Sequence, residues 1–238
     1  MGVTARNILF AGATGLIGGL ALRRLLADSN FTGKVLAPMR RAVQVSDTRL
    51  SAPITDFAST SDDVALREAI RSAPGHRLDT FLSCLGTTIK TAGSRGAFIA
   101  VDRELVLRLA QLAFDEGARH AILVSSAGAS RQSGNFYLRV KGEVEDALAK
   151  IGFDRIDILR PGLLLGQRAE RRPGEKLAQL LAPIANPALV GQFRRYRAVD
   201  ADAVSAAIVR LLGYSEPGLF IHAYDSITRL STPASAAE

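Results

Sequence analysis

Residues 10–18 read Phe10-Ala11-Gly12-Ala13-Thr14-Gly15-Leu16-Ile17-Gly18, and this stretch decides the fold. A mainly apolar run, residues 7–11, leads into the glycines and is typical of a buried strand, while apolar residues at helical spacing follow them. Glycines let a backbone turn tightly and approach a ligand, and a helix that begins there turns its positive end toward an anion. The stretch therefore predicts a nucleotide phosphate site between a strand and a helix, with glycines spaced GxxGxxG.

The composition is that of a globular domain with a sizeable core. The chain has 238 residues, of which 47% are hydrophobic and 22% charged. No apolar run approaches the ~20 residues that span a bilayer, and Gly12 interrupts the N-terminal segment where a secretory signal would continue. One cysteine, Cys84, and three scattered histidines predict no disulfide and no metal site. We therefore expect a cytoplasmic protein that does not associate with membranes.

The net charge is +7, and arginines gather at residues 168–172 and 194–197. A basic surface can bind nucleic acid. No nucleic-acid-binding motif accompanies these arginines, however. We therefore expect an anionic cofactor to account for part of the basic surface, and no nucleic-acid partner.

Short apolar runs alternate with helical patterns along the chain. Strands are expected at residues 7–11, 34–39, 52–55, 80–84, 121–125, 155–160 and 219–222, and helices from residue 16 and at 61–70, 96–116, 135–150 and 200–212. This alternation predicts an α/β fold, a Rossmann-like doubly wound parallel sheet covered on both faces. Prolines break it after Pro161, so residues 161–198 are expected to form a small C-terminal substrate-side lobe within a single domain, residues 1–238.

An arginine pair follows the second predicted strand. Proteins that bind NAD usually carry an acid there, about 20 residues after the glycines, to hold the ribose 2′-hydroxyl. Here Arg40 stands 22 residues beyond Gly18, and Arg41 follows it. Arginine pairs with a 2′-phosphate that an acid would repel, so the expected cofactor is NADP(H), unless these arginines are only solvated surface charges. Asp56 and Phe57, after the third strand, are candidates to contact the adenine, unless Asp56 only caps its own loop.

A serine pair, a tyrosine and a lysine form a candidate catalytic set. Ser125 and Ser126 end the fifth predicted strand, and Tyr137 and Lys141 stand four residues apart on the next helix. Residues i and i+4 share a helix face, so the ammonium of Lys141 favours loss of the Tyr137 proton. Tyr137 could then exchange a proton with a substrate oxygen that Ser126, or alternatively Ser125, orients. Hydride transfer to a carbonyl requires such a set.

These motifs together resemble the short-chain dehydrogenase/reductase superfamily, in its atypical branch. The match is closest to the Tat-interacting-protein-like group of NAD(P)H-binding oxidoreductases, and covers residues 6–213. It is carried by the glycine motif, the serine pair, the Tyr137-x-x-x-Lys141 motif, and the stretches 83–88, 101–103, 141–145, 153–155, 159–165 and 172–175. The resemblance implies a Rossmann fold and a cofactor lined by Gly12, Ala13, Thr14, Gly15, Leu16, Ile17, Arg40, Leu85, Gly86 and Thr87, with Ser125 and Lys141 beside them and Pro161, Gly162 and Leu163 at the nicotinamide.

The expected function is that of an NADPH-dependent oxidoreductase acting on a carbonyl or related group of a small molecule. The alternative is an NADP(H)-sensing regulatory module that binds a protein partner with little turnover, since some atypical relatives act in this way. A sugar-nucleotide epimerase is a weaker alternative, because such enzymes usually carry a larger C-terminal lobe than the residues after Pro161 provide.

The sequence departs from the wider superfamily at one position. Many of its members have an asparagine on the helix after the fourth strand, where it completes a proton relay, but this chain has Asp102. Asp102 could substitute for the asparagine, or it could pair with Arg103 or Arg108. Cys84, beside the expected cofactor loop, is interpreted as a small buried residue, with a reactive thiol as the alternative, and His120 is interpreted as a structural residue.

Overall fold

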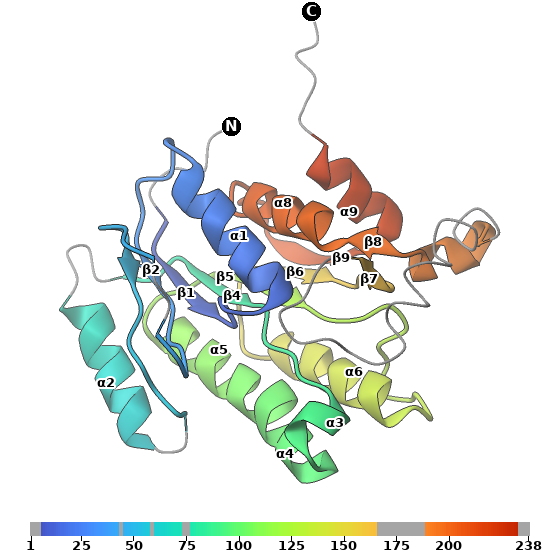
Figure 1. Cartoon of the computed structure of the whole chain (residues 1–238), viewed down its shortest axis with the longest axis horizontal. Helices are drawn as coiled ribbons and strands as arrows, with labels where there is room; N and C mark the ends of the chain where they lie inside the picture. The colour runs from blue at the N-terminus through green and yellow to red at the C-terminus, as the bar shows by residue number, and fades with distance from the viewer. Residues whose placement is uncertain (1–5, 43–44, 58–59, 73–76, 166–188, 233–238) are drawn as a thin grey trace, which may run out of the picture.

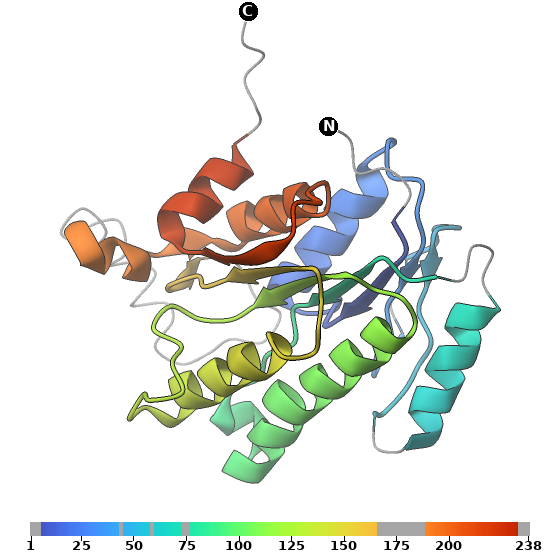
Figure 2. The same ribbon diagram turned by 180° about the vertical axis from the view of Figure 1, so that it is seen from behind.

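The computed structural model describes residues 6–42, 45–57, 60–72, 77–165 and 189–232. Seven parallel strands form one sheet in the order β3-β2-β1-β4-β5-β6-β9, and helices cover both of its faces (Figures 1 and 2). The predicted doubly wound Rossmann-like sheet is therefore confirmed. The order reverses between β1 and β4, and ligands of such sheets bind at the carboxyl ends of the strands at that point.

The elements follow the order expected from the sequence. The strands of the main sheet are β1 (Ile8–Ala11), β2 (Val35–Leu36), β3 (Leu50–Ser51), β4 (Thr80–Ser83), β5 (His120–Val124), β6 (Arg155–Leu159) and β9 (Gly218–His222). A separate pair is formed by β7 (Leu164–Leu165) and β8 (Val199–Asp200). The helices are α1 (Leu16–Ala27), α2 (Thr60–Arg71), α3 (Ile89–Ala92), α4 (Arg95–Ile99), the π-helical turn η1 (Ala100–Leu105), α5 (Val106–Asp115), α6 (Phe136–Leu148), the 3-10 turn η2 (Gly191–Tyr196), α8 (Ala201–Leu211) and α9 (Tyr224–Ser231).

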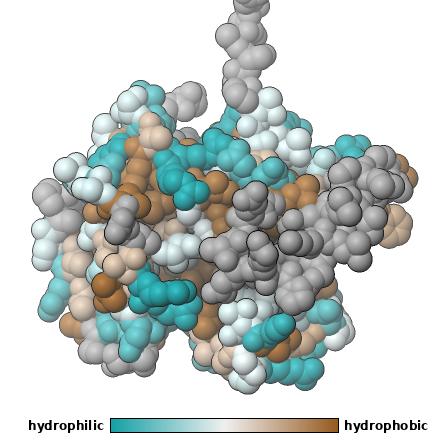
Figure 3. Space-filling model, viewed as in Figure 1, coloured by the Kyte–Doolittle hydropathy of each residue, from teal (hydrophilic) through white to brown (hydrophobic). Residues whose placement is uncertain are grey.

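Two apolar cores hold the layers together, one on each face of the sheet. Alternate strand residues point to opposite faces, so that Ile8 and Phe10 of β1 pack under α1 and α8, and Leu9 and Ala11 pack over α5. Most residues of β1, β4, β5 and β6 are fully buried. Figure 3 shows one outer face of the molecule, on which hydrophilic and hydrophobic residues are interspersed.

Side chains of the residues that precede α6 and α8 cap the first amides of these helices. Asn135 accepts a hydrogen bond from the Leu138 amide at the start of α6, and Asp200 accepts one from the Asp202 amide at the start of α8. The two caps fix where each helix begins. α6 matters most for function because it carries Tyr137 and Lys141.

The structure departs from the sequence expectations at the sheet edge and at the C-terminus. β2 is shorter than the expected strand at residues 34–39, and β3 lies at Leu50–Ser51, before the expected range 52–55, which was therefore wrong. Pro38 and Pro53 lack N–H groups, so that only a Met39–Ile54 bridge continues the pairing beyond these two strands. The helix expected at residues 96–116 is present but contains η1, and α9 had not been predicted. Most of the expected substrate lobe, including Arg168, lies outside the described residues. No described helix is long and apolar enough to cross a membrane.

Candidate functional site

The glycine turn packs directly on the loop that follows β4. Gly12 has a φ of +81°, and a Cβ there would lie 2.6 Å from the Cys84 carbonyl carbon and the Leu85 amide nitrogen. A Cβ at Gly18 would lie 2.1 Å from the Gly12 carbonyl oxygen. Side chains at Gly12 and Gly18 are therefore excluded by backbone, and the turn, α1 and the β4 loop form one tightly packed unit.

The same turn is open on its outer side. Thr14 and Gly15 are exposed and Leu16 is partly exposed, whereas Ala13 and Ile17 are buried. Gly15 precedes α1 without any side-chain cap, and the first turn of α1 contains no acid. The first N–H groups of α1 are thus uncapped by a side chain, and no carboxylate there repels an anion. This geometry suits a phosphate group.

Arg40 and Arg41 lie at the same edge of the sheet as the glycine turn, because β1 and β2 are adjacent and parallel. Both side chains are exposed, and neither makes an ion pair with any described residue. Asp56 is also exposed in the loop beyond β3. Phe57 has a φ of +60°, which is uncommon for a residue with a side chain, and its carbonyl oxygen accepts a hydrogen bond from Arg108 at 2.8 Å.

The loop after β4 reaches from the glycine turn to α6. Leu85 is partly buried and Gly86 is exposed. A Cβ at Gly86 would lie 3.8 Å from the Nζ atom of Lys141 and 3.8 Å from Oδ1 of Asp102. The loop therefore brings the expected cofactor residues and the expected catalytic lysine to one place.

Lys141 is almost completely buried and pairs with an acid. Its Nζ atom lies 2.8 Å from Oδ1 of Asp102, which has no solvent exposure. Oδ2 of the same carboxylate accepts a hydrogen bond from the Thr87 amide at 2.8 Å. The sequence left Arg103 and Arg108 open as partners of Asp102; both alternatives are wrong, because Arg103 pairs with Glu143 and Arg108 lies beside Asp63.

The two serines and the tyrosine have different surroundings. Ser126 is partly exposed at the carboxyl end of β5, and Tyr137 is partly exposed in the first turn of α6, with its ring 5.8 Å from that of Phe98. Ser125 is buried, and its hydroxyl donates to Glu145, which also pairs with Arg160. The Ser125–Glu145–Arg160 network had no signal in the sequence, because it joins residues from three separate elements.

The loop after β6 also lies at the carboxyl ends of the strands, and it contains Pro161, Gly162 and Leu163. The Pro161 carbonyl oxygen accepts a hydrogen bond from the Ala127 amide at 2.8 Å. A Cβ at Gly162 would lie 2.4 Å from the Arg197 carbonyl oxygen, so η2 packs closely on this loop. The loop expected at the nicotinamide is thus fixed to the segment after Ser125 and to η2.

Two further residues singled out by the sequence lie at opposite ends of the sheet: Cys84 directly follows β4 at this edge, whereas His120 begins β5. Burial raises the pKa of the Cys84 thiol, which keeps the thiol protonated. His120 is buried and hydrogen bonds to Asp157 at 2.7 Å, as its structural interpretation requires. Within the described part of the chain, no group of histidine, cysteine or acidic side chains is placed to hold a metal ion.

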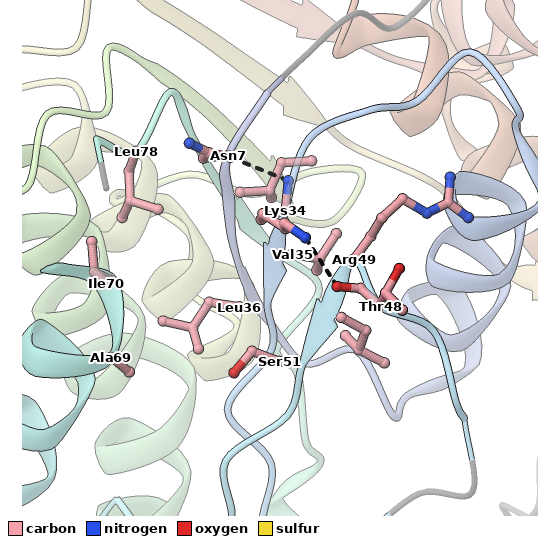
Figure 4. Close-up of a pocket in the computed structure, with 12 residues that line it drawn as sticks. Asn7, Lys34, Val35, Leu36, Thr48, Arg49, Ser51, Ala69, Ile70 and Leu78 are labelled. Carbon is pink, nitrogen blue, oxygen red and sulfur yellow. Dashed lines mark hydrogen bonds between the residues drawn. The ribbon is translucent and has the colours of Figure 1, made fainter. Parts of the chain in front are cut away.

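A separate pocket of about 110 Å³ lies at the amino ends of the strands, opposite the carboxyl ends that form the candidate site (Figure 4). Asn7, Lys34 and Thr48 line it at the amino ends of β1, β2 and β3, and the Lys34 ammonium donates to the Thr48 carbonyl oxygen at 3.0 Å. The glycine turn is at the carboxyl end of β1. This pocket is therefore not part of the nucleotide site.

Comparison with known proteins identifies relatives over most of the chain, although no family model matches it. The chain is 36% identical over 203 residues to protein fmp52, mitochondrial, of Aspergillus clavatus, which covers 85% of each protein. It is 37% identical over 176 residues to protein HTATIP2 of Rattus norvegicus, covering 73% of this chain and 69% of that protein.

Solved structures share the fold at low sequence identity. A short chain dehydrogenase family protein from Francisella tularensis superposes with a TM-score of 0.61 at 14% identity, over 92% of this chain and 97% of that one. UDP-glucose 4-epimerase from Thermotoga maritima, solved with UDP-glucose, gives a TM-score of 0.66 at 15% identity, over 94% of this chain and 81% of that one.

The relatives correct one expectation and confirm another. The cytoplasmic location expected from the sequence is contradicted, because the fmp52 relatives from several fungi are named mitochondrial proteins. The absence of a secretory signal pattern does not separate cytoplasmic from mitochondrial proteins, which is why the inference failed. The family, in contrast, is confirmed: this chain belongs to the atypical short-chain dehydrogenases/reductases, in the Tat-interacting-protein-like group that includes HTATIP2 and fmp52.

Proposed function

We propose that this protein is an NADPH-dependent oxidoreductase that transfers hydride to a carbonyl or related group of a small molecule. One observation carries the proposal. The loop after β4 contacts the glycine turn at Gly12 and approaches the Lys141 ammonium at Gly86, so a nucleotide cradle and a Tyr-Lys pair share one edge of the sheet. A dinucleotide that extends from the cradle along this edge would bring its nicotinamide to Tyr137.

The residues of this chain would divide the work as follows. The N–H groups at the start of α1 hold the pyrophosphate, and Arg40 pairs with the 2′-phosphate, helped by Arg41. Asp56 and Phe57 border the adenine. Lys141 binds the nicotinamide ribose, and the remaining residues of the three loops line the cofactor. When bound, NADPH supplies the hydride.

Tyr137 and Ser126 would then handle the substrate oxygen. The substrate carbonyl carbon accepts the hydride, the π electrons move to the oxygen, and that oxygen takes the proton of the Tyr137 hydroxyl. The Ser126 hydroxyl holds the oxygen during this step. Solvent afterwards returns a proton to Tyr137. Ser125 is engaged by Glu145, which favours Ser126 for this role.

Cofactor titration tests the first half of the proposal. Binding of NADPH and of NADH is followed by fluorescence on the wild type, on Arg40→Glu, and on Arg229→Glu, whose exposed arginine lies on α9. Because a charge-assisted pair is worth about 1.5–3 kcal/mol, Arg40→Glu should weaken NADPH binding roughly 10- to 100-fold and change NADH binding little. Equal affinity of the wild type for both cofactors would refute the 2′-phosphate contact.

Measurements of turnover test the second half of the proposal, which is hydride transfer with Tyr137 as the proton donor. NADPH oxidation is followed with a panel of aldehydes and ketones, and Tyr137→Phe should lower the rate by roughly 10²- to 10⁴-fold while leaving NADPH binding intact. Full turnover by Tyr137→Phe would contradict the assigned proton donor. Tight NADPH binding with no turnover on any substrate would instead favour the sensing module that binds a regulatory protein partner.

A further inference from the structure

Asp102 connects three parts of the candidate site through one carboxylate. It belongs to η1, it lies 2.8 Å from the Lys141 ammonium of α6, and it accepts a hydrogen bond from the Thr87 amide in the loop after β4. Its exposed fraction is zero. π-Helical turns inside longer helices are uncommon and frequently occur at functional sites. Here the turn is the segment that contributes this buried acid.

We propose that Asp102 is a positioning residue that joins the Thr87 loop to Lys141 and balances the lysine charge, so that cofactor and Tyr137 meet a neutral pair rather than a lone ammonium. This inference rests on the proposed oxidoreductase function. Two contacts from one carboxylate hold the loop and the lysine in a single arrangement. Reaction rates are sensitive to such placement, because small displacements of positioned groups are costly.

The charge balance follows from burial. An ammonium that is 5% exposed pays a large desolvation penalty unless an anion compensates it. At Tyr137, one helical turn away, an ion pair exerts a weaker field than a lone ammonium would. Asp102 therefore reduces the positive charge that Tyr137 meets one helical turn away.

Other charged groups around Tyr137 are compensated or lie near the surface. Charged groups on α6, η1, α4 and the end of β6 include the Arg103–Glu143 pair at 2.9 Å, with Glu104 3.5 Å from Arg103. They also include Arg95 and Arg139, stacked on Phe136 at 5.0 and 5.8 Å, and the buried Glu145 with its partner Arg160. Among the described residues, Asp102 is the acid that contacts Lys141.

Two substitutions separate the charge of Asp102 from its hydrogen bond. Asp102→Asn retains an oxygen that can accept from the Thr87 amide but removes the charge, whereas Asp102→Ala removes both. Glu104→Gln, a neighbouring acid that is 62% exposed, is the matched control. NADPH affinity and the pH dependence of kcat are measured for all three, with circular dichroism to verify folding.

Each variant has a distinct expected result. Asp102→Ala should weaken NADPH binding roughly tenfold, Asp102→Asn should restore most of that binding, and Glu104→Gln should match the wild type. In Asp102→Asn the kcat profile should shift along the pH axis relative to that of the wild type, because the buried charge of Lys141 is no longer balanced. A profile that superimposes on that of the wild type overturns the charge role, even if Asp102→Ala does not fold.

Failure of the two proposals can be told apart. A wild-type chain that binds NADPH without any turnover would refute the oxidoreductase function. The positioning role of Asp102 would then be decided by NADPH binding alone. It is supported if Asp102→Asn binds more tightly than Asp102→Ala, and overturned if both bind as the wild type does.

Discussion

Two adjacent serines at the end of β5 have separable roles at the residue scale. Ser125 is buried and its hydroxyl donates to Glu145, whereas Ser126 is partly exposed at the site. Ser125→Ala should lower the free energy of unfolding by about 1–2 kcal/mol, because Glu145 is buried and loses a donor. Ser126→Ala should leave the stability within about 0.5 kcal/mol of the wild type but lower turnover.

Urea denaturation and steady-state kinetics on both serine variants check this division. Each serine variant is the control for the other, because both substitutions remove a hydroxyl oxygen at adjacent positions. The assignment of Ser126 would be wrong if Ser125→Ala lost turnover at unchanged stability while Ser126→Ala kept it.

Residue types near the site were predictable, but several partners were not. The sequence identified Asp102 as a departure from the family pattern because its position on the helix was clear. It offered Arg103 and Arg108 as partners and did not identify Lys141, because the Asp102–Lys141 contact depends on how α6 packs on η1. Sequence spacing shows which residues share a helix face, and contacts between helices require the fold.

At the scale of elements, α6 is held in place by a close approach to the loop after β5. A Cβ at Gly142 would lie 2.3 Å from the Arg131 amide nitrogen and 2.3 Å from the Ser130 carbonyl carbon. Both are backbone atoms, so α6 itself must move if Gly142 becomes alanine. Gly142→Ala should therefore displace Tyr137 and Lys141, reduce turnover roughly tenfold or more, and destabilise the fold by about 1–3 kcal/mol.

Gly134→Ala is the matched control, because a Cβ at Gly134 would have no atom within 4 Å. It lies just before α6 and should leave turnover and stability nearly unchanged. Kinetics and thermal unfolding of the two variants are compared. Equal behaviour of Gly142→Ala and Gly134→Ala would show that α6 tolerates the displacement.

Most elements were predictable because their apolar periodicity is strong and their caps are readable. β4, β5 and β6 are buried and mainly apolar, and α6 and α8 begin within one residue of the expected starts at 135 and 200. The edge strands were less predictable, since prolines limit their pairing to a few residues. α9 was missed because Tyr224–Ser231 is short and presents one fully buried residue, Ile227, to the core.

For the whole molecule, a buried polar cluster joins three strands at one side of the sheet. Asp157 of β6 accepts hydrogen bonds from His120 of β5 and His222 of β9, each at 2.7 Å, and from Arg155 at 2.6 Å. Arg155 also stacks 4.1 Å from the Phe220 ring centre. Since β9 is the edge strand, this cluster contributes to holding the last strand to the rest of the sheet.

The cluster makes the fold sensitive to acid. Burial holds the pKa of His120 below its ordinary 6.5, and its Nδ1 atom has no hydrogen-bond partner among the described residues. Burial acts to raise the pKa of Asp157, but hydrogen bonds from His120, His222 and Arg155 outweigh it and hold that pKa well below the ordinary 3.8. Below about pH 6.5 the unfolded chain binds a proton at residue 120 that the folded chain resists. The stability that His120 contributes is therefore present above pH 6.5 and declines as the pH falls, while the contribution of Asp157 is lost only below about pH 3.8.

Substitutions at residues 120 and 157 test this acid sensitivity. Asp157→Asn should lower the free energy of unfolding by about 3–5 kcal/mol at pH 7.5, because Arg155 stays buried without its anion, whereas the exposed Asp154→Asn should change it little. His120→Gln should flatten the decline in stability between pH 7.5 and 5.5 relative to the wild type, because it removes the group that titrates there. Urea denaturation at both pH values gives the slopes. Equal slopes for His120→Gln and the wild type would show that His120 does not couple folding to acid, and the buried cluster would then stabilise the sheet independently of pH in this range.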